Sequence, residues 1–288
     1  MENLLVLTLK PIPRSYDDVL RLANYVKSLV PISDFPKIGI ICGSGLADIG
    51  DAITEKFLIP YSSIPEFPQT SVTGHKGNLL FGKLGGKTVV CLQGRFHPYE
   101  HSMNLALCSL PVRMMHLMGV TTLIVSNAAG GINDTFKKGD FMLIKDHVCM
   151  PALAGHSPLV GLNDPRWGLR FVSLKDQYDV ELRKTAKIVA EKQGIKVHEG
   201  VYVMSGGPQY ESGAEIELYK RAGCDALGMS TSHEVIVARQ CGIKVLGISV
   251  ISNIANEEAN PSHLEVLETA QAIGYKITSF VEGIIREL

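Results

Sequence analysis

The sequence has almost no charge imbalance, no long apolar run and no paired cysteine motif, and each absence excludes a class of protein. There are 28 Lys and Arg against 29 Asp and Glu, so we do not expect a surface for duplex nucleic acid. No stretch approaches the ~18 consecutive apolar residues that a membrane-spanning helix needs. The N-terminal MENLLVLTLKPIP has no basic segment before its apolar patch, so we expect no signal peptide.

The cysteines and carboxylates exclude two further kinds of site. The six cysteines include no CxxC pair, and several lie inside apolar runs, which is typical of reduced core thiols. We therefore expect a cytoplasmic protein. No cluster of metal-binding carboxylates occurs, so we expect no metal. Hydrophobic residues make up 45% of the chain and charged residues 20%, which suits a globular protein with a sizeable core.

Short apolar runs alternate with helical patterns along the chain. Runs rich in Val, Ile and Leu end at Gly or Asn, as buried strands do: IGIIC, GNLLFGKL, KTVVCLQ, TTLIVSN, DFMLIKDHV, EGVYVMSGG, CDALGMS and KVLGISVIS. Helical patterns cover residues 104–117, 180–192, 213–222, 234–241 and 263–288. The alternation predicts one α/β domain over residues 1–288 with a mostly parallel or mixed sheet. The segment from Leu159 lacks periodicity, and such a long loop is usually functional.

Three known motifs fit only in part. After the glycine turn at residues 43–45, a dinucleotide fingerprint needs Gly or Ala where Asp48 stands. FGKLGGKT has Phe81 where the first glycine of a phosphate-binding loop belongs. HEVIV has Val237 where a zinc-protease helix needs its second histidine. We therefore reject a nicotinamide-dependent dehydrogenase, a P-loop enzyme and a zinc protease.

Seven segments with Gly and polar residues are expected to follow strands. They are residues 43–45, TGHKG, QGRFHPYE, SNAAGG, GGPQYE, GMSTSHE and VISNIAN. Each alone is compatible with a plain turn, and Arg95 could simply pair with Glu100. Ligands of open α/β sheets bind at the carboxyl ends of strands, so the seven together predict one site.

The polar side chains of these segments favour an anionic ligand. Arg95 supplies a planar, permanently charged fork that suits phosphate, and Ser and His side chains add donors. The GxSxG motif of a serine nucleophile is absent. The residues thus favour a reaction in which a bound anion is the nucleophile and the protein supplies position and electrostatics.

The ordered set of motifs resembles the trimeric, low-molecular-mass purine nucleoside phosphorylases, which are related to methylthioadenosine phosphorylases. The matching stretches are GIICGSGL, GHKGNLLFG, GRFHPYE, SNAAGGIN, GDFMLIKDH, GGPQYE, GCDALGMSTSHEVIVARQCGIKVLGIS and ISN, in order from residue 38 to 253. The resemblance implies one α/β domain with a mixed sheet, a distorted barrel and flanking helices, assembled as a homotrimer. It implies reversible phosphorolysis of nucleosides to a free base and (deoxy)ribose 1-phosphate in purine salvage, with inorganic phosphate as co-substrate and no cofactor.

Carried over residue by residue, the resemblance assigns roles to individual side chains. The implied phosphate site consists of Ser44, His75, Arg95, His97, Ala128 and Ser230. Tyr99 and Met229 would contact the ribose, and His263 would meet its 5′-hydroxyl. Tyr210 would pack on the base, while Glu211 and Asn253 would hydrogen-bond its edge. Asn253, Glu211 and His97 would act in catalysis, and Trp167 would reach the active site of the neighbouring subunit.

Several positions depart from the family pattern. Ser232 and His233 stand where relatives usually have Val and Pro, and Pro98, His101, Ser102 and Ile254 also differ. The segment between Asn253 and His263 is shorter than usual. Because these changes alter the base side, we expect ordinary phosphate handling with a changed base range.

The sequence leaves two questions of function open: which nucleosides are the substrates, and whether the chain is an enzyme. Asn253 favours 6-oxopurine nucleosides such as inosine and guanosine, since the methylthioadenosine branch typically has aspartate there. Adenosine, methylthioadenosine or pyrimidine nucleosides are alternative substrates. A non-catalytic nucleoside-binding paralogue is the alternative to an enzyme.

Overall fold

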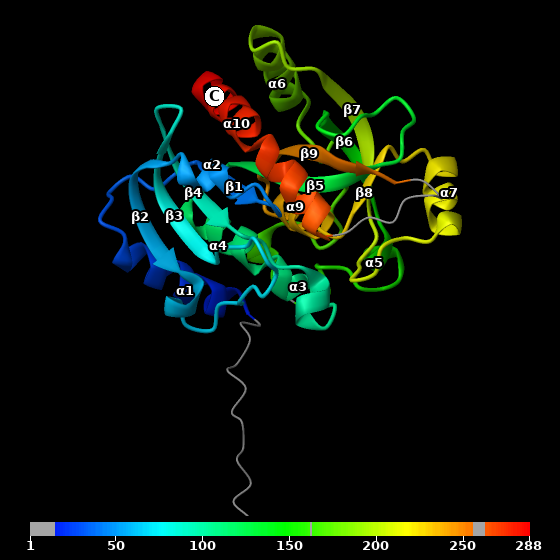
Figure 1. Cartoon of the computed structure of the whole chain (residues 1–288). Helices are drawn as coiled ribbons and strands as arrows, with labels where there is room; N and C mark the ends of the chain where they lie inside the picture. Colours follow the sequence, from blue (N-terminus) through cyan, green and yellow to red (C-terminus); the bar gives the residue numbers. More distant parts are fainter. Residues whose placement is uncertain (1–14, 162, 256–262) are drawn as a thin grey trace, which may run out of the picture.

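A computed structural model describes residues 15–161, 163–255 and 263–288 of the chain, and its strands form one nine-stranded mixed sheet (Figure 1). The strands are β1 (Ile38–Cys42), β2 (Thr54–Pro60), β3 (Asn78–Leu84), β4 (Lys87–Gln93), β5 (Thr122–Gly131), β6 (Phe141–Cys149), β7 (Val197–Met204), β8 (Ala226–Gly228) and β9 (Lys244–Ile254). The helices are α1 (Tyr16–Leu29), α2 (Asp48–Asp51), α3 (Leu105–Cys108), α4 (Leu110–Met118), α5 (Met150–Leu153), α6 (Val180–Lys192), α7 (Gly213–Arg221), α8 (Ser232–Gln240), α9 (His263–Ala272) and α10 (Gly274–Glu287). Short 3-10 turns are η1 (Tyr61–Ser63), η2 (Pro98–His101) and η3 (Pro165–Trp167).

Part of the sheet closes on itself. The strand order is β2-β3-β4-β1-β5-β8-β7-β6-β9, and β5 pairs with β9 as well. This extra pairing closes β5, β8, β7, β6 and β9 into a barrel, from which β1, β4, β3 and β2 extend as an open sheet. Strand β1 runs parallel to β4 and β5, and β5 runs parallel to β9, so their carboxyl ends meet. The predicted α/β domain with a mixed sheet, a distorted barrel and flanking helices is confirmed.

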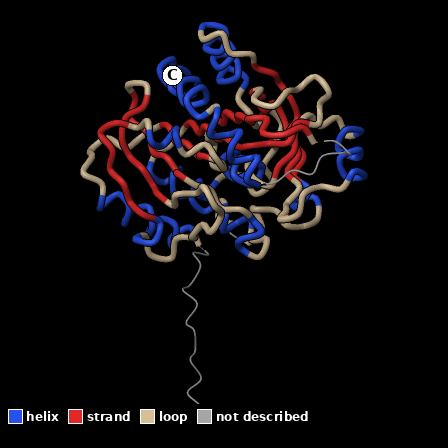
Figure 2. The backbone as a smooth tube through the Cα atoms, viewed as in Figure 1, coloured by secondary structure: helices blue, strands red, loops and turns tan. Residues whose placement is uncertain are grey.

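Two hydrophobic clusters lie on opposite faces of the sheet. In β1, Ile41 belongs to the cluster under α1, α4 and α8, while Ile40 and Cys42 belong to the cluster under α6 and α10. Figure 1 shows α1 and α4 on one side of the sheet and α6 and α10 on the other, and Figure 2 shows the strands between these helices. Because successive side chains of a strand point to opposite faces, an all-apolar strand needs a covering layer on each. In the described residues, no helix is long and apolar enough to cross a bilayer.

Helix α1 and strand β2 escaped the sequence analysis. Helix α1 begins at a capping box between Ser15 and Asp18, and its buried residues recur at helical spacing from Val19 to Val26. Strand β2 is mostly exposed and pairs only with β3, and its apolar run is short, from Phe57 to Ile59. Its first three residues are polar and exposed, which is common in a strand at the edge of a sheet.

Other differences concern where elements begin and end. Residues 126–131 and 250–254, expected as loops, are the final residues of β5 and β9, because the two strands pair along their whole length. The expected helix over residues 263–288 breaks at Ile273, where Gly274 packs against Asp48 of α2. Residues 104–117 form two helices, α3 and α4, that meet at Ser109.

Candidate active site

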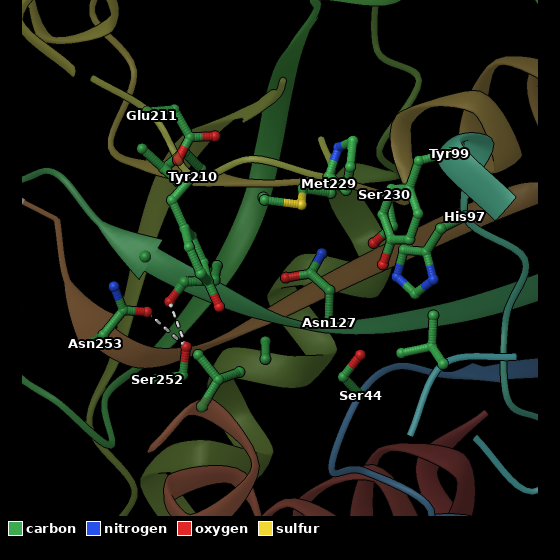
Figure 3. Close-up of a pocket in the computed structure, with 18 of the residues that line it drawn as sticks. Ser44, His97, Tyr99, Asn127, Tyr210, Glu211, Met229, Ser230, Ser252 and Asn253 are labelled. Atoms are coloured by element: carbon green, nitrogen blue, oxygen red, sulfur yellow. Dashed lines mark hydrogen bonds between the residues drawn. The ribbon is translucent and has the colours of Figure 1, made fainter. Parts of the chain in front are cut away.

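One cavity of about 410 Å³ opens at the carboxyl ends of β1, β4, β5 and β9 (Figure 3). Ten of the residues predicted for the site line it: Ser44, Arg95, His97, Tyr99, Ala128, Tyr210, Glu211, Met229, Ser230 and Asn253. His75 lies just behind the wall. The side chain of His263 and residues 256–262 fall outside the described residues, so the contact with a 5′-hydroxyl stays a prediction.

In the turn after β1, the backbone lies very close to atoms of neighbouring strands and loops. A Cβ atom on Gly43 would lie 2.8 Å from Arg95 Nη1 and 2.7 Å from the carbonyl oxygen of Ser126, so only glycine fits there. Ser44 follows, and its hydroxyl lies 3.0 Å from His75 Nε2. The backbone N–H of Arg95 donates to His75 Nδ1 at 2.9 Å. Burial lowers the pKa of His75 to about 3. The ring is therefore neutral; its Nδ1 also lies 3.0 Å from the carbonyl oxygen of Arg95, and its Nε2 holds the Ser44 hydroxyl at the cavity wall.

Arg95 is held by a partner far away in the sequence. Its guanidinium donates two hydrogen bonds to the carboxylate of Glu234, at 3.1 and 2.8 Å, and a third to the carbonyl of Ser126. Arg95 and Glu234 are each no more than 2% exposed. A guanidinium has five N–H groups, so two remain for a ligand. The alternative pairing of Arg95 with Glu100 is wrong, and Glu234 was missed because nothing in the sequence links it to Arg95.

Glu100 instead orients His97. The carboxylate accepts from the backbone N–H of His97 at 2.9 Å and lies 3.2 Å from its Nδ1. Burial alone would raise the pKa of Glu100, but hydrogen bonds from His97 and Ser71 outweigh it and hold that pKa well below its usual range. An ionised carboxylate only accepts, so Nδ1 carries the proton. Burial lowers the pKa of His97, and the neutral ring then offers Nε2 as an acceptor at the cavity wall.

A second hydroxyl group faces the same end of the cavity. Ser230 lies at the start of the turn between β8 and α8, and its hydroxyl is 3.2 Å from that of Thr231. Thr231 has a φ of 77°, which L-residues rarely adopt, and Asn127 donates to its hydroxyl at 2.9 Å. Asn127 itself lines the cavity although the sequence analysis gave it no role. The strained turn and the amide together fix where Ser230 points.

The opposite end of the cavity is lined by a carboxyl group, a phenol ring and an amide. Figure 3 shows Glu211, Tyr210 and Asn253 there, with Met229 between the two ends. Burial raises the pKa of Glu211, partly opposed by a hydrogen bond with Ser205. Tyr210 is 39% exposed and forms part of the rim. Ser252, also missed in the sequence, places its hydroxyl 2.9 Å from Asn253 Oδ1. This end can hydrogen-bond the edge of a flat heterocycle.

Trp167 does not fit its prediction. The indole is 1% exposed and packs within its own subunit, with its ring 4.5 Å from that of Tyr16 and the Arg113 guanidinium 4.7 Å above it. A side chain buried in this way cannot reach a neighbour's cavity. The lone tryptophan therefore anchors the long segment to the core.

Among the described residues no three His, Cys, Asp or Glu side chains are grouped as a metal site would require. The cavity wall offers donors at one end and an amide with a carboxyl group at the other. Its chemistry is that of anion binding beside a hydrogen-bonding pocket, and the absence of a cofactor stays a prediction.

Comparison with known proteins identifies similar chains over nearly the whole length. Residues 37–286 match the family described as the Phosphorylase superfamily. A purine nucleoside phosphorylase from Rattus norvegicus is 43% identical over 280 residues, which cover 95% of this chain and 96% of the rat protein.

Solved structures of purine nucleoside phosphorylases are also similar to this chain. The crystal structure of Schistosoma mansoni purine nucleoside phosphorylase in complex with inosine has a TM-score of 0.90 and 46% identity, covering 96% of this chain and 98% of that one. Isoform 2 from the same organism, in complex with cytosine and ribose-1-phosphate, has a TM-score of 0.89 and 42% identity, covering 96% and 99%.

Proposed function

The chain belongs to the phosphorylase superfamily, and we propose that it is an enzyme that catalyses the reversible phosphorolysis of purine nucleosides and deoxynucleosides. The products are the free base and (deoxy)ribose 1-phosphate, and 6-oxopurine nucleosides are the main substrates. One observation carries this proposal: a single cavity joins an anion-binding end to an end that can hydrogen-bond a base.

Phosphate binds at the end formed by β1, β4 and the turn before α8. Arg95 offers two free N–H groups, and the hydroxyls of Ser44 and Ser230 donate alongside it. The backbone at Ala128 and the ring of His75 complete the set, His75 acting through Ser44. Neutral His97 accepts a hydrogen bond at Nε2 from the protonated phosphate oxygen, which orients an unprotonated oxygen for attack on C1′.

The sugar lies between the two ends, against Tyr99 and Met229. As the glycosidic bond lengthens, positive charge develops on the ribosyl ring and negative charge on the leaving base. The phosphate stabilises the first charge. Asn253 donates to the base where the second collects, so its hydrogen bond strengthens in the transition state. Glu211 accepts from the ring N–H of a 6-oxopurine, and Tyr210 packs on the base.

A wider base range is a second proposal. The departures at Ser232, His233 and Ile254 motivate it, and one similar structure holds a pyrimidine base, cytosine. We therefore include adenosine and pyrimidine nucleosides among the candidate substrates. No metal or cofactor takes part in the proposed reaction.

We also propose a homotrimer in the cytoplasm. Large apolar side chains in α5 and in the segment before α6 are exposed in the single chain, among them Leu153 (75%), Leu169 (73%) and Phe171 (90%). Such a concentration supports a subunit interface. All six cysteines are buried and free, which suits a reducing compartment. Sedimentation equilibrium should give three times the 31.3 kDa chain mass, and a monomer or dimer would contradict the trimer.

The function is tested by measuring base release from inosine, guanosine, adenosine and cytidine, each with and without phosphate. Release that requires phosphate and yields ribose 1-phosphate supports a phosphorylase. Release without phosphate would identify a hydrolase instead. If no nucleoside is cleaved although phosphate raises the melting temperature, the chain is a binding paralogue.

A further inference from the structure

The peptide between Gly94 and Arg95 turns the chain out of β4 and toward the cavity. Gly94 has a φ of 120°, which L side chains rarely adopt. A Cβ atom there would lie 3.0 Å from the Cβ atom of His75, closer than side chains normally pack. Because glycine populates many backbone conformations, contacts from other segments must set the direction in which Arg95 leaves the strand.

Two side chains hold the two polar groups of that peptide. The hydroxyl of Tyr61 donates to the carbonyl oxygen of Gly94 at 2.6 Å. The N–H of the same peptide belongs to Arg95 and donates to His75 Nδ1 at 2.9 Å. A peptide unit is planar, so contacts to its oxygen and to its N–H together fix the orientation of the plane.

Tyr61, at the start of η1, contacts the chain on both sides of Arg95. Its ring packs against Phe67 and Phe96, with ring centroids 5.1 and 5.2 Å away, and Phe96 directly follows Arg95. Tyr61 is 1% exposed, and burial raises the pKa of its phenol well above the usual value. The hydroxyl therefore keeps the proton that it donates to Gly94.

An effect of Tyr61 on a ligand must pass through Arg95. Tyr61 is not among the described residues that line the cavity, whereas Arg95 is. Glu234 holds the guanidinium, and the corner at Gly94 holds the backbone from which that side chain extends. A planar guanidinium binds an oxyanion well only over a narrow range of angles, so both supports matter.

We propose that Tyr61 is a positioning residue that sets the direction of Arg95 toward bound phosphate. Without the hydroxyl, the buried carbonyl of Gly94 loses this donor. Rotation of the peptide toward another donor would draw the N–H of Arg95 away from His75. This inference rests on the proposed phosphorolysis and adds a residue outside the cavity to its phosphate site.

The test is Tyr61→Phe, which keeps the ring and removes the hydroxyl. We expect KM for phosphate to rise by about tenfold while KM for inosine changes by less than about threefold. Tyr178→Phe is the matched control: Tyr178 is fully buried, and its hydroxyl lies 2.9 Å from His147 Nδ1. Both variants should melt at lower temperature than the unaltered chain, but only Tyr61→Phe should change KM for phosphate.

A second measurement needs no turnover. Phosphate should raise the melting temperature less in Tyr61→Phe than in the unaltered chain or in Tyr178→Phe.

Two outcomes would overturn the inference. One is an unchanged KM for phosphate in Tyr61→Phe. The other is an equal rise in both variants, which would reflect a general loss of packing. If the unaltered chain releases no base from any nucleoside with phosphate present, the proposed function fails. The effect of phosphate on the melting temperature would then decide whether Tyr61 positions an anion site.

Discussion

At the scale of single residues, the buried ion pair of Arg95 and Glu234 fixes the position of a positive charge at the cavity wall. A buried carboxylate that loses its partner is costly, by about 3–5 kcal/mol. Glu234 therefore balances the charge of Arg95 while leaving two of its N–H groups for a ligand. The pair positions the guanidinium, and in the proposed reaction phosphate supplies the acceptors for its remaining N–H groups.

Replacing Arg95 by lysine tests the geometry of the guanidinium separately from its positive charge. Lysine keeps the positive charge beside Glu234 but cannot donate bidentately to the carboxylate and bind phosphate at once. We expect KM for phosphate to rise by about 10–100-fold, with a much smaller change in KM for the nucleoside. Steady-state kinetics with each substrate varied in turn measures this. A rise confined to the nucleoside KM would show that Arg95 does not bind phosphate.

A substitution of Asn253 tests whether this side chain hydrogen-bonds the edge of the base. Asp cannot donate, so Asn253→Asp removes the N–H offered to a 6-oxo group and leaves only acceptors. We expect inosine kcat/KM to fall by about 10²–10³ and the adenosine-to-inosine ratio to rise by at least about 100-fold. Competition assays with both nucleosides give the ratio directly. An unchanged ratio would mean that this residue does not contact the base edge.

At the scale of elements, helix α1 is stabilised by its N-terminal cap as well as by its buried face. Ser15 accepts from the backbone N–H of Asp18, and Asp18 accepts from that of Ser15, each at 3.1 Å. These bonds satisfy donors that a helix start leaves free. The helix packs on α4, on the face of the sheet that holds α8. It thus stabilises the fold from outside the cavity.

Ser15→Ala should lower the free energy of unfolding by about 1 kcal/mol without changing kinetic constants. Loss of the cap exposes unpaired N–H groups but leaves the cavity untouched. Ser28→Ala is the control, because Ser28 is exposed near the other end of the same helix and should change stability by less than about 0.5 kcal/mol. Chemical denaturation compares the two. Equal effects would argue against the capping role.

For the whole molecule, buried histidines couple stability to pH. Burial lowers the pKa of His147 and of His233 to about 4, and that of His75 to about 3. Unfolded histidine has a pKa near 6.5, so between these values the unfolded chain binds more protons than the folded one. Stability is therefore fully present above pH ~6.5 and is lost as the pH falls toward the folded pKa values.

Acidification from pH 7 to pH 5 should lower the free energy of unfolding by about 2 kcal/mol for each fully buried histidine. His233→Gln should make the pH dependence shallower, because its side chain does not titrate in this range. Melting temperatures across this pH range, measured for both proteins, provide the comparison. If both proteins lose stability equally, His233 does not contribute.

Several features of the fold and site could be read from local sequence. The apolar runs predicted eight of the strands, and the motifs containing Ser44, Arg95 and Asn253 predicted residues that do line the cavity. These elements could be predicted because their requirements are local: buried strands need apolar side chains and tight turns need glycine. Edge strand β2 was missed because only three consecutive residues in it are apolar, from Phe57 to Ile59.

By itself the sequence determined the α/β class, the order of the strands along the chain and the polar inventory of the site. The tertiary structure decided which side chains meet: Arg95 with Glu234 across 139 positions, and Trp167 with its own core. It also decided the bulge between β5 and β9 at Ser252, whose hydroxyl lies beside Asn253. Contacts between distant segments depend on packing and register, which local propensity and spacing do not encode.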